Sequence, residues 1–297
     1  MTTFEKCNIC PHNCNINRKL SKGFCQMSDK IKLAKAYLHK WEEPCISGNN
    51  GSGTVFFSGC NLKCVFCQNF KISQENFGKE VTSEELSEIF LNLQKKGAHN
   101  INLVSPTIYL PAIKNNIIIS KNSGLTIPIV YNSNAYENVS ALRALSGLID
   151  IYLPDLKYFE DAVSIKYSKA PGYFKYASKA VLEMFRQVGI PRFDEKGILK
   201  RGLIIRHLIL PGKIDETKKI LKWIKENLPE EIYISLMGQY TPYYKACDFP
   251  EINKKISHNE YEDVINYFFD IGLKNGYVQE ANCASDKFIP DFDLEGI

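Results

Sequence analysis

The stretch from residue 53 to residue 69 reads GTVFFSGCNLKCVFCQN, an apolar run that leads into a cysteine loop. The β-branched and aromatic residues 54–57 predict a buried strand, and the cysteines follow at its carboxyl end. Their spacing puts Cys60, Cys64 and Cys67 on one short loop. Three thiolates can each bind one iron of a [4Fe-4S] cluster, which leaves the fourth iron open. An open coordination position is typical of a catalytic metal centre; a structural zinc knuckle is the alternative for this spacing alone.

Beyond this loop, short apolar runs alternate with amphipathic stretches, the pattern of βα units around a parallel sheet. The predicted strands are residues 54–57, 100–104, 127–131, 149–153, 203–210 and 232–236. The predicted helical regions are residues 83–96, 110–121, 137–145, 162–188, 215–227 and 258–272. This order predicts an α/β fold, a partial (βα)6 TIM-like barrel two units short of the closed form. Barrel enzymes build their active sites at the carboxyl ends of the strands, where the cysteine loop lies.

The chain divides by composition into a cysteine-rich N-terminal segment, residues 1–50, and the barrel with a C-terminal helical extension, residues 51–297. The first segment is rich in turn residues, so regular structure is expected only after it. It carries four closely spaced cysteines: Cys7, Cys10, Cys14 and Cys25. Zinc and a fully ligated [4Fe-4S] cluster fit this spacing equally well. A structural metal is the default, and an auxiliary cluster for electron transfer or substrate binding is the alternative.

The remaining cysteines, Cys45, Cys247 and Cys283, are expected to be ordinary thiols. The composition of the 297 residues, 44% hydrophobic and 24% charged, excludes disordered, collagen-like and coiled-coil classes. A dispersed net charge of +4 argues against nucleic acid and membrane surfaces as partners. No apolar run approaches the roughly 18 residues of a spanning helix, and no secretion signal is evident. We therefore expect a cytoplasmic protein.

The cysteine loop resembles the signature of the radical S-adenosylmethionine (SAM) superfamily, with the aromatic Phe66 before the third cysteine. Within that superfamily the chain resembles the pyruvate formate-lyase activating enzymes and their uncharacterised homologues. The resemblance covers most of residues 50–282, through NINLVSPT, YNSNAY, YLPDLKY, RHLILPG and SLMGQYTP. It implies an oxidoreductase in which the cluster cleaves SAM reductively to a 5'-deoxyadenosyl radical for hydrogen abstraction.

The resemblance also implies which residues contact SAM. The backbone around Phe66 would meet the adenine. Where the family has a Gly-Gly-Glu-Pro-like turn for the methionine amino group, this chain has Ser105-Pro106-Thr107, so Ser105 and Thr107 are the substitutes. Asp155 and Lys157 match an Asp-x-Lys pair that orders SAM, and their spacing puts both side chains on one face. A surface pair without a ligand is the alternative.

Polar residues after or within three other strands complete the candidate site. Asn132 and Asn134 match a loop that commonly carries Asp and Asn, although both are also plain turn formers. Arg206 and His207 interrupt an apolar strand, and only one of them can line the barrel because strand neighbours face opposite ways. Arg206 is expected near the SAM carboxylate and His207 in packing. Gln239 is expected near the SAM ribose.

The resemblance implies a protein or peptide substrate and a reductant such as flavodoxin or ferredoxin. Its narrowest form is activation of a glycyl radical enzyme, with a glycine Cα of the partner as the target. An open barrel favours a large substrate. An iron-sulfur electron carrier or assembly factor without SAM chemistry is the alternative, and SAM binding separates the two.

Overall fold

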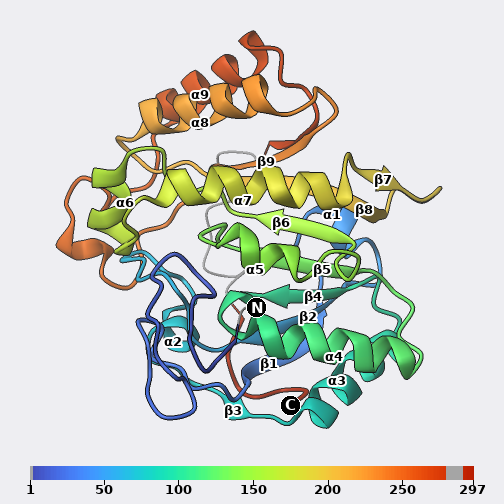
Figure 1. Cartoon of the computed structure of the whole chain (residues 1–297). Helices are drawn as coiled ribbons and strands as arrows, with labels where there is room; N and C mark the ends of the chain where they lie inside the picture. Colours follow the sequence, from blue (N-terminus) through green and yellow to red (C-terminus); the bar gives the residue numbers. More distant parts are fainter. Residues whose placement is uncertain (1–2, 279–289) are drawn as a thin grey trace.

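The computed structural model describes residues 3–278 and 290–297. Within them, ten strands form a sheet in the order β10-β9-β8-β6-β5-β4-β2-β1-β3, with β7 paired to β8 (Figure 1). Seven consecutive strands in that order are parallel. Six lie at the predicted positions: β2 (Ser52–Phe57), β4 (Ile101–Val104), β5 (Ile129–Ser133), β6 (Ile151–Pro154), β8 (Leu199–Leu208) and β9 (Tyr233–Met237). The seventh, β10 (Gly276–Val278), pairs with β9. They confirm the predicted α/β fold and its partial barrel.

The helices between these strands also agree with the predicted regions. They are α3 (Ser83–Lys95), α4 (Leu110–Asn122), α5 (Val139–Arg143), α6 (Asp161–Ser168), α7 (Tyr173–Val188), α8 (Ile214–Asn227) and α9 (His258–Asp270). Thr82 begins α3 with a capping box to Glu85, which satisfies two otherwise unpaired backbone donors. The region predicted at 162–188 is two helices, because Lys169 adopts a left-handed conformation at φ 51° ahead of Pro171 and Gly172.

The expectation that regular structure starts after residue 50 is wrong. Strand β1 (Lys32–His39) pairs antiparallel with β2, so the predicted boundary at residue 50 falls between two adjacent strands of one sheet. Its sequence, KLAKAYLH, has no β-branched residue and no strict alternation. Local propensity therefore predicts no strand, and the pairing with β2 supplies the stabilisation. Two-residue strands β3 (Lys79–Glu80) and β7 (Arg192–Phe193) and the terminal β10 (Gly276–Val278) were also not predicted.

Because β1 runs antiparallel to β2, it carries the chain to the amino-terminal end of the parallel strands. The short helix α1 (Pro44–Ser47) follows there, and Cys45 and Ile46 pack against side chains of β5, β6 and β8. Their contacts are Val130, Ile151, Leu153, Leu199 and Ile204. This segment closes that end of the barrel. A second short helix, α2 (Phe70–Ser73), follows the cysteine loop at the opposite end.

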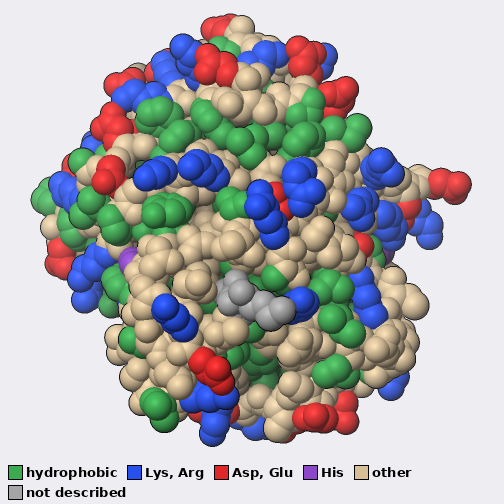
Figure 2. All heavy atoms as spheres, viewed as in Figure 1, with side chains coloured by type: hydrophobic (Ala, Val, Ile, Leu, Met, Phe, Trp, Pro, Cys, Tyr) green, Lys and Arg blue, Asp and Glu red, His purple; other side chains and the backbone are tan. Residues whose placement is uncertain are grey.

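No helix in the described ranges is long and apolar enough to cross a membrane. Lys and Arg side chains are interspersed with Asp and Glu on the face that Figure 2 shows.

Candidate active site

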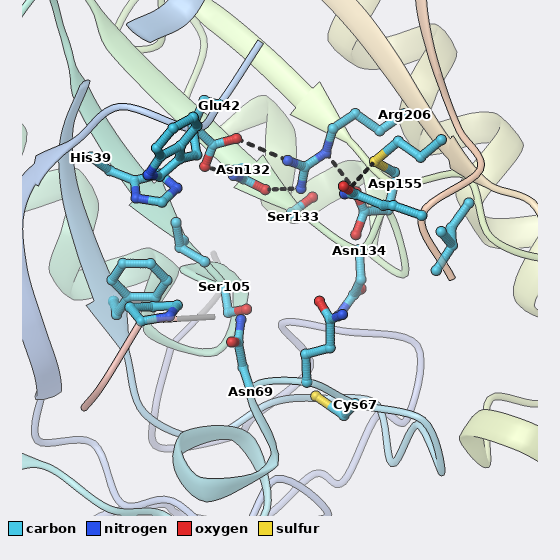
Figure 3. Close-up of a pocket in the computed structure, with 18 of the residues that line it drawn as sticks. His39, Glu42, Cys67, Asn69, Ser105, Asn132, Ser133, Asn134, Asp155 and Arg206 are labelled. Carbon is cyan, nitrogen blue, oxygen red and sulfur yellow. Dashed lines mark hydrogen bonds and ion pairs between the residues drawn. The ribbon is translucent and has the colours of Figure 1, made fainter. Parts of the chain in front are cut away.

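A cavity of about 730 Å³ lies inside the barrel and reaches the cysteine loop (Figure 3). Its volume is within the range of about 300–1,000 Å³ typical of ligand pockets. Most residues predicted for the site line it: Cys60, Cys64, Phe66, Cys67, Ser105, Asn132, Asn134, Asp155, Lys157, Arg206 and Gln239. Thr107 does not line it, because its hydroxyl is buried and donates to Glu137 at 3.1 Å.

The sulfurs of the cysteine loop receive hydrogen bonds from several elements. The Leu62 backbone N–H and the Asn134 amide donate to Cys60 Sγ at 3.3 and 3.4 Å. The Ser168 hydroxyl donates to Cys64 Sγ at 2.9 Å. Donors of this kind stabilise the thiolate form and tune an iron-sulfur cluster.

The three thiols fit a cubane cluster better than a single ion. In the described part of the chain no three His, Cys, Asp or Glu side chains are arranged to hold one metal ion. A cubane takes one thiolate per iron, so its sulfurs need not converge on one point. Burial raises the pKa of Cys60 to about 11 and that of Cys67 to about 12. Iron binding to this loop must therefore release protons.

Asn61, inside the cysteine loop, anchors the loop to its surroundings. Its amide donates to Tyr136 O at 2.7 Å, and its Oδ1 accepts from Asn134 at 2.8 Å. Its carbonyl also contacts His12 Nε2 at 2.9 Å, which joins the N-terminal segment to the loop. Sequence reasoning did not select Asn61, although a buried amide between two metal-ligand candidates is a usable signal.

Arg206 organises the floor of the cavity through all three of its guanidinium nitrogens. Its Nε donates to Asp155 at 2.8 Å, its Nη1 to Glu42 at 3.1 Å, and its Nη2 to Asn132 at 2.7 Å. These partners are labelled around the guanidinium in Figure 3. The structure thus places Arg206 inside the barrel, while His207 faces α8 and contacts Thr217 at 2.9 Å. The contact with a SAM carboxylate stays a prediction, and the second N–H group on each Nη is the donor available for it.

Asp155 also pairs with Lys157, at 2.8 Å, as the spacing of two predicted. Burial alone would raise the pKa of Asp155, but Arg206 and Lys157 outweigh it and hold the pKa below its usual value. Burial alone would lower the pKa of Lys157, but Asp155 outweighs it and the pKa rises. The pair is therefore ionised, and an ammonium has two further donors that can point at a ligand.

Glu42 is a site residue that the sequence analysis missed. It precedes α1, and it accepts from Asn102 at 3.1 Å and from Asn132 at 3.4 Å besides pairing with Arg206. Its neighbour Glu43 has a buried Oε2 with no hydrogen-bond partner among the described residues. Burial raises the pKa of both carboxyls, against the field of Arg206. The only local signal was a Glu-Glu pair before Pro44, which does not by itself indicate a site.

Three further predicted positions have a defined local geometry. Ser105 lines the cavity with φ 60°, a left-handed conformation that favours glycine, and the resembled family has glycine in this turn. Phe66 packs edge-on against Tyr240 with ring centres 5.6 Å apart. Gln239 makes only a weak contact, 3.9 Å, with Met237 Sδ.

The N-terminal cysteines lie beside the cysteine loop, but the predicted second metal site is not shown. Cys7 and Cys25 are buried, and Phe24 N donates to Cys14 Sγ at 3.4 Å. Phe24 stacks on His12 at 3.6 Å, which connects this segment to Asn61. Burial raises the pKa of Cys10 to about 12. Cys45 is buried, Cys247 is exposed, and Cys283 lies outside the described residues.

Comparison with known proteins agrees with this geometry. Residues 54–224 match the Radical SAM superfamily. Two proteins of Methanocaldococcus jannaschii are similar to this chain. Uncharacterized protein MJ0674 is 33% identical over 88% of this chain and 74% of its own length. Uncharacterized protein MJ0808 is 24% identical over 82% of this chain and 73% of its own length.

Solved structures show the same fold. Streptococcus suis SuiB bound to S-adenosylmethionine has a TM-score of 0.51 at 16% identity, over 75% of this chain and 49% of that one. SuiB bound to precursor peptide SuiA has a TM-score of 0.52 at 16% identity, over 76% of this chain and 48% of that one. The chain thus spans about half the length of these structures. It belongs to the radical SAM superfamily, whose enzymes use a [4Fe-4S] cluster and S-adenosylmethionine.

Proposed function

We propose that this protein is a radical SAM enzyme that abstracts a hydrogen atom from a polypeptide substrate. The observation that carries the proposal is the meeting of three thiols and the Lys157–Asp155–Arg206 network on one cavity. When bound, the cluster supplies the electron that cleaves SAM reductively to the 5'-deoxyadenosyl radical that abstracts the hydrogen.

The residues of the chain prepare the site for this chemistry. Cys60, Cys64 and Cys67 hold the cluster, and the donors on their sulfurs stabilise it. Lys157 is oriented by Asp155 and offers its remaining donors to the SAM carboxylate, where a charge-assisted hydrogen bond is strong. The barrel wall keeps water away from reactive intermediates.

The substrate is proposed to be a protein or peptide, because the sheet of the described residues ends at β10 and at β3 without closing on itself and so leaves room for a large molecule. SuiB, which shares the fold, has been crystallised with a precursor peptide. The narrowest form of the proposal is an activating enzyme that takes hydrogen from a glycine Cα of a glycyl radical enzyme. Flavodoxin or ferredoxin would supply the electron, in the cytoplasm.

We also propose that Cys7, Cys10, Cys14 and Cys25 bind a second metal group. Zinc and an auxiliary [4Fe-4S] cluster are the two candidates, because each accepts four thiolates. Zinc would require these sulfurs to converge on one point, which no three of them do in the described residues. The contact of His12 with Asn61 links this segment to the catalytic loop, so its metal would stabilise that loop. Metal analysis of a Cys10→Ala, Cys14→Ala variant distinguishes iron from zinc.

The test is anaerobic incubation of the reconstituted protein with SAM and dithionite. We expect 5'-deoxyadenosine and methionine, with a variant carrying alanine at Cys60, Cys64 and Cys67 as the inactive control. S-adenosylhomocysteine as the sole product would mean polar methyl transfer and refute the radical chemistry. An absence of SAM binding by cluster-loaded protein would favour an electron carrier or assembly factor.

A further inference from the structure

Residues 290–297 run beside β1, near the edge of the sheet that lies opposite β9 (Figure 1). Strand β3 covers the outer edge of β1 only at Lys32 and Leu33. Past that point the edge is taken by the C-terminal segment: Leu294 N donates to Ala34 O at 3.2 Å, and Ala36 N donates to Glu295 O at 2.8 Å. Main-chain bonds of this type are how sheet edges bind extended peptides.

The approach of this segment to β1 is close and specific. Gly296 has φ 78°, and a Cβ there would lie 2.0 Å from Ala36 O. Only glycine fits such a position. The segment is therefore seated in one defined place on the strand.

An apolar pocket beside the edge receives Phe292. This side chain is buried against Ala34, Phe56, Ile72 and Val104, and its ring lies 5.4 Å from that of Phe56. Phe56, Ile72 and Val104 also line the active-site cavity, and Pro290 does so from the segment itself. The pocket for Phe292 is thus continuous with the candidate active site.

Charge complementarity fixes the segment beside this pocket. The Lys35 side chain is only 8% exposed, and its ammonium pairs with Asp293 at 3.0 Å and with Glu295 at 2.9 Å. It also donates to Asp291 O at 3.0 Å, and Lys71 donates to Phe292 O at 3.1 Å. Asp293 and Glu295 remain 54% and 59% exposed, so water competes for these ion pairs. Lys35 therefore favours a peptide with acidic side chains at this edge, and Phe292 is its apolar anchor.

We propose that this edge of β1 and its aromatic pocket are the docking site for an extended acidic segment of the polypeptide substrate, carrying a large apolar side chain. Residues 290–297 occupy the site in cis and are displaced when substrate binds. The inference rests on the proposed polypeptide substrate. An attached segment has an effective concentration on the order of millimolar, so it competes strongly with a free peptide. Weakening its contacts must therefore expose the site.

The test uses the full-length, cluster-loaded protein and a fluorescent peptide with the sequence of residues 290–297, PDFDLEGI. A tail-weakened variant carries Phe292→Ala, Asp293→Asn and Glu295→Gln. We expect it to bind the peptide at least tenfold more tightly than the wild type does. Hydrogen exchange of the Ala36 amide should also accelerate in the variant, because its bond to Glu295 O is lost.

Two changes test specificity in the tail-weakened background. Lys35→Met should reduce peptide binding at least tenfold. Lys30→Met, which removes an exposed lysine that pairs with Glu80, should leave peptide binding unchanged. A peptide with alanine in place of its phenylalanine should also bind at least tenfold more weakly. Unchanged Ala36 exchange, no peptide binding, or equal binding after Lys35→Met would each overturn the proposal.

These readouts need no reductant and no SAM cleavage. Peptide binding without 5'-deoxyadenosine formation would refute the proposed function and leave the docking site in place. SAM cleavage without peptide binding would refute the docking site alone.

Discussion

Replacing Arg206 with methionine tests how the charged floor of the cavity is held together. The side chains of Arg206, Glu42 and Asp155 are 16%, 10% and 19% exposed, so solvent screens their interactions little. Removing one partner of a buried ion pair costs about 3–5 kcal/mol, because the other charge is left without compensation. Without Arg206, Asp155 still pairs with Lys157, whereas Glu42 has only amide donors as partners and can take up a proton. We therefore expect the lower end, about 3 kcal/mol, or about 6 °C in Tm at about 2 °C per kcal/mol.

The companion change, Glu42→Gln, leaves Arg206 two of its three partners. We expect it to cost about 2 kcal/mol, within the range of about 1.5–3 kcal/mol for one hydrogen bond to a charged group. The double variant leaves no uncompensated charge on this pair. Its loss should therefore be smaller than the sum of the single losses by about 1–2 kcal/mol.

Thermal unfolding of the three variants, followed by circular dichroism without the cluster, measures these losses. Arg201→Met is the matched control, because Arg201 lies on the same strand and donates to the Gln187 carbonyl at 2.7 Å. Losses that add to within about 0.5 kcal/mol would show that Glu42 and Arg206 are not coupled. A loss for Arg206→Met no larger than that for Arg201→Met would refute the buried-network reasoning.

Three further outcomes are expected. Changing Cys60, Cys64 and Cys67 together to alanine should remove one cluster and all SAM cleavage but leave any metal at the N-terminal cysteines in place. Loss of both metals from folded protein would contradict two independent sites. Lys157→Ala should weaken SAM binding in a titration while the cluster absorbance persists, whereas wild-type affinity would remove its assigned role. Glu137, whose pKa burial raises to about 7, should make the wild type about 2 kcal/mol less stable at pH 8 than at pH 5, because the folded state holds the proton up to about pH 7 while the unfolded chain loses it near its ordinary pKa of 4.5. Glu137→Gln should flatten this dependence in Tm measurements, and an equal slope in both proteins would rule out Glu137 as its source.

The fold could be predicted wherever local pattern and final environment agree. Parallel strands such as β4 and β6 are buried on both faces and read as short, mostly apolar runs. Amphipathic helices such as α3 and α8 carry a clear periodicity and acidic first turns. Strand β1 was missed because its stabilisation comes from partners distant in the sequence: β2 and the C-terminal segment.

The same distinction applies to the site. The cysteine loop, Asp155 with Lys157, and Arg206 follow or end parallel strands, where the rule for barrel active sites finds them. Glu42 reaches the cavity from the opposite end, because the antiparallel β1 carries the chain there. No periodicity or residue spacing in the sequence indicates that Glu42 lines the cavity.

The charges on the cavity floor bear on the cofactor it receives. Glu42 and Asp155 line the cavity with the cations Lys157 and Arg206, and the carboxyl of Glu43 is buried next to Glu42 behind the floor. SAM carries a sulfonium and an ammonium against one carboxylate, so its net charge is positive and complements this acidic excess. Because burial raises the pKa of Glu42 and Glu43, a cationic ligand favours their ionised forms and the floor favours the ligand. The Glu42→Gln variant should accordingly bind SAM more weakly than the wild type, because it removes one of the carboxylates that favour a cationic ligand. An unchanged affinity would mean that the floor acts on stability alone.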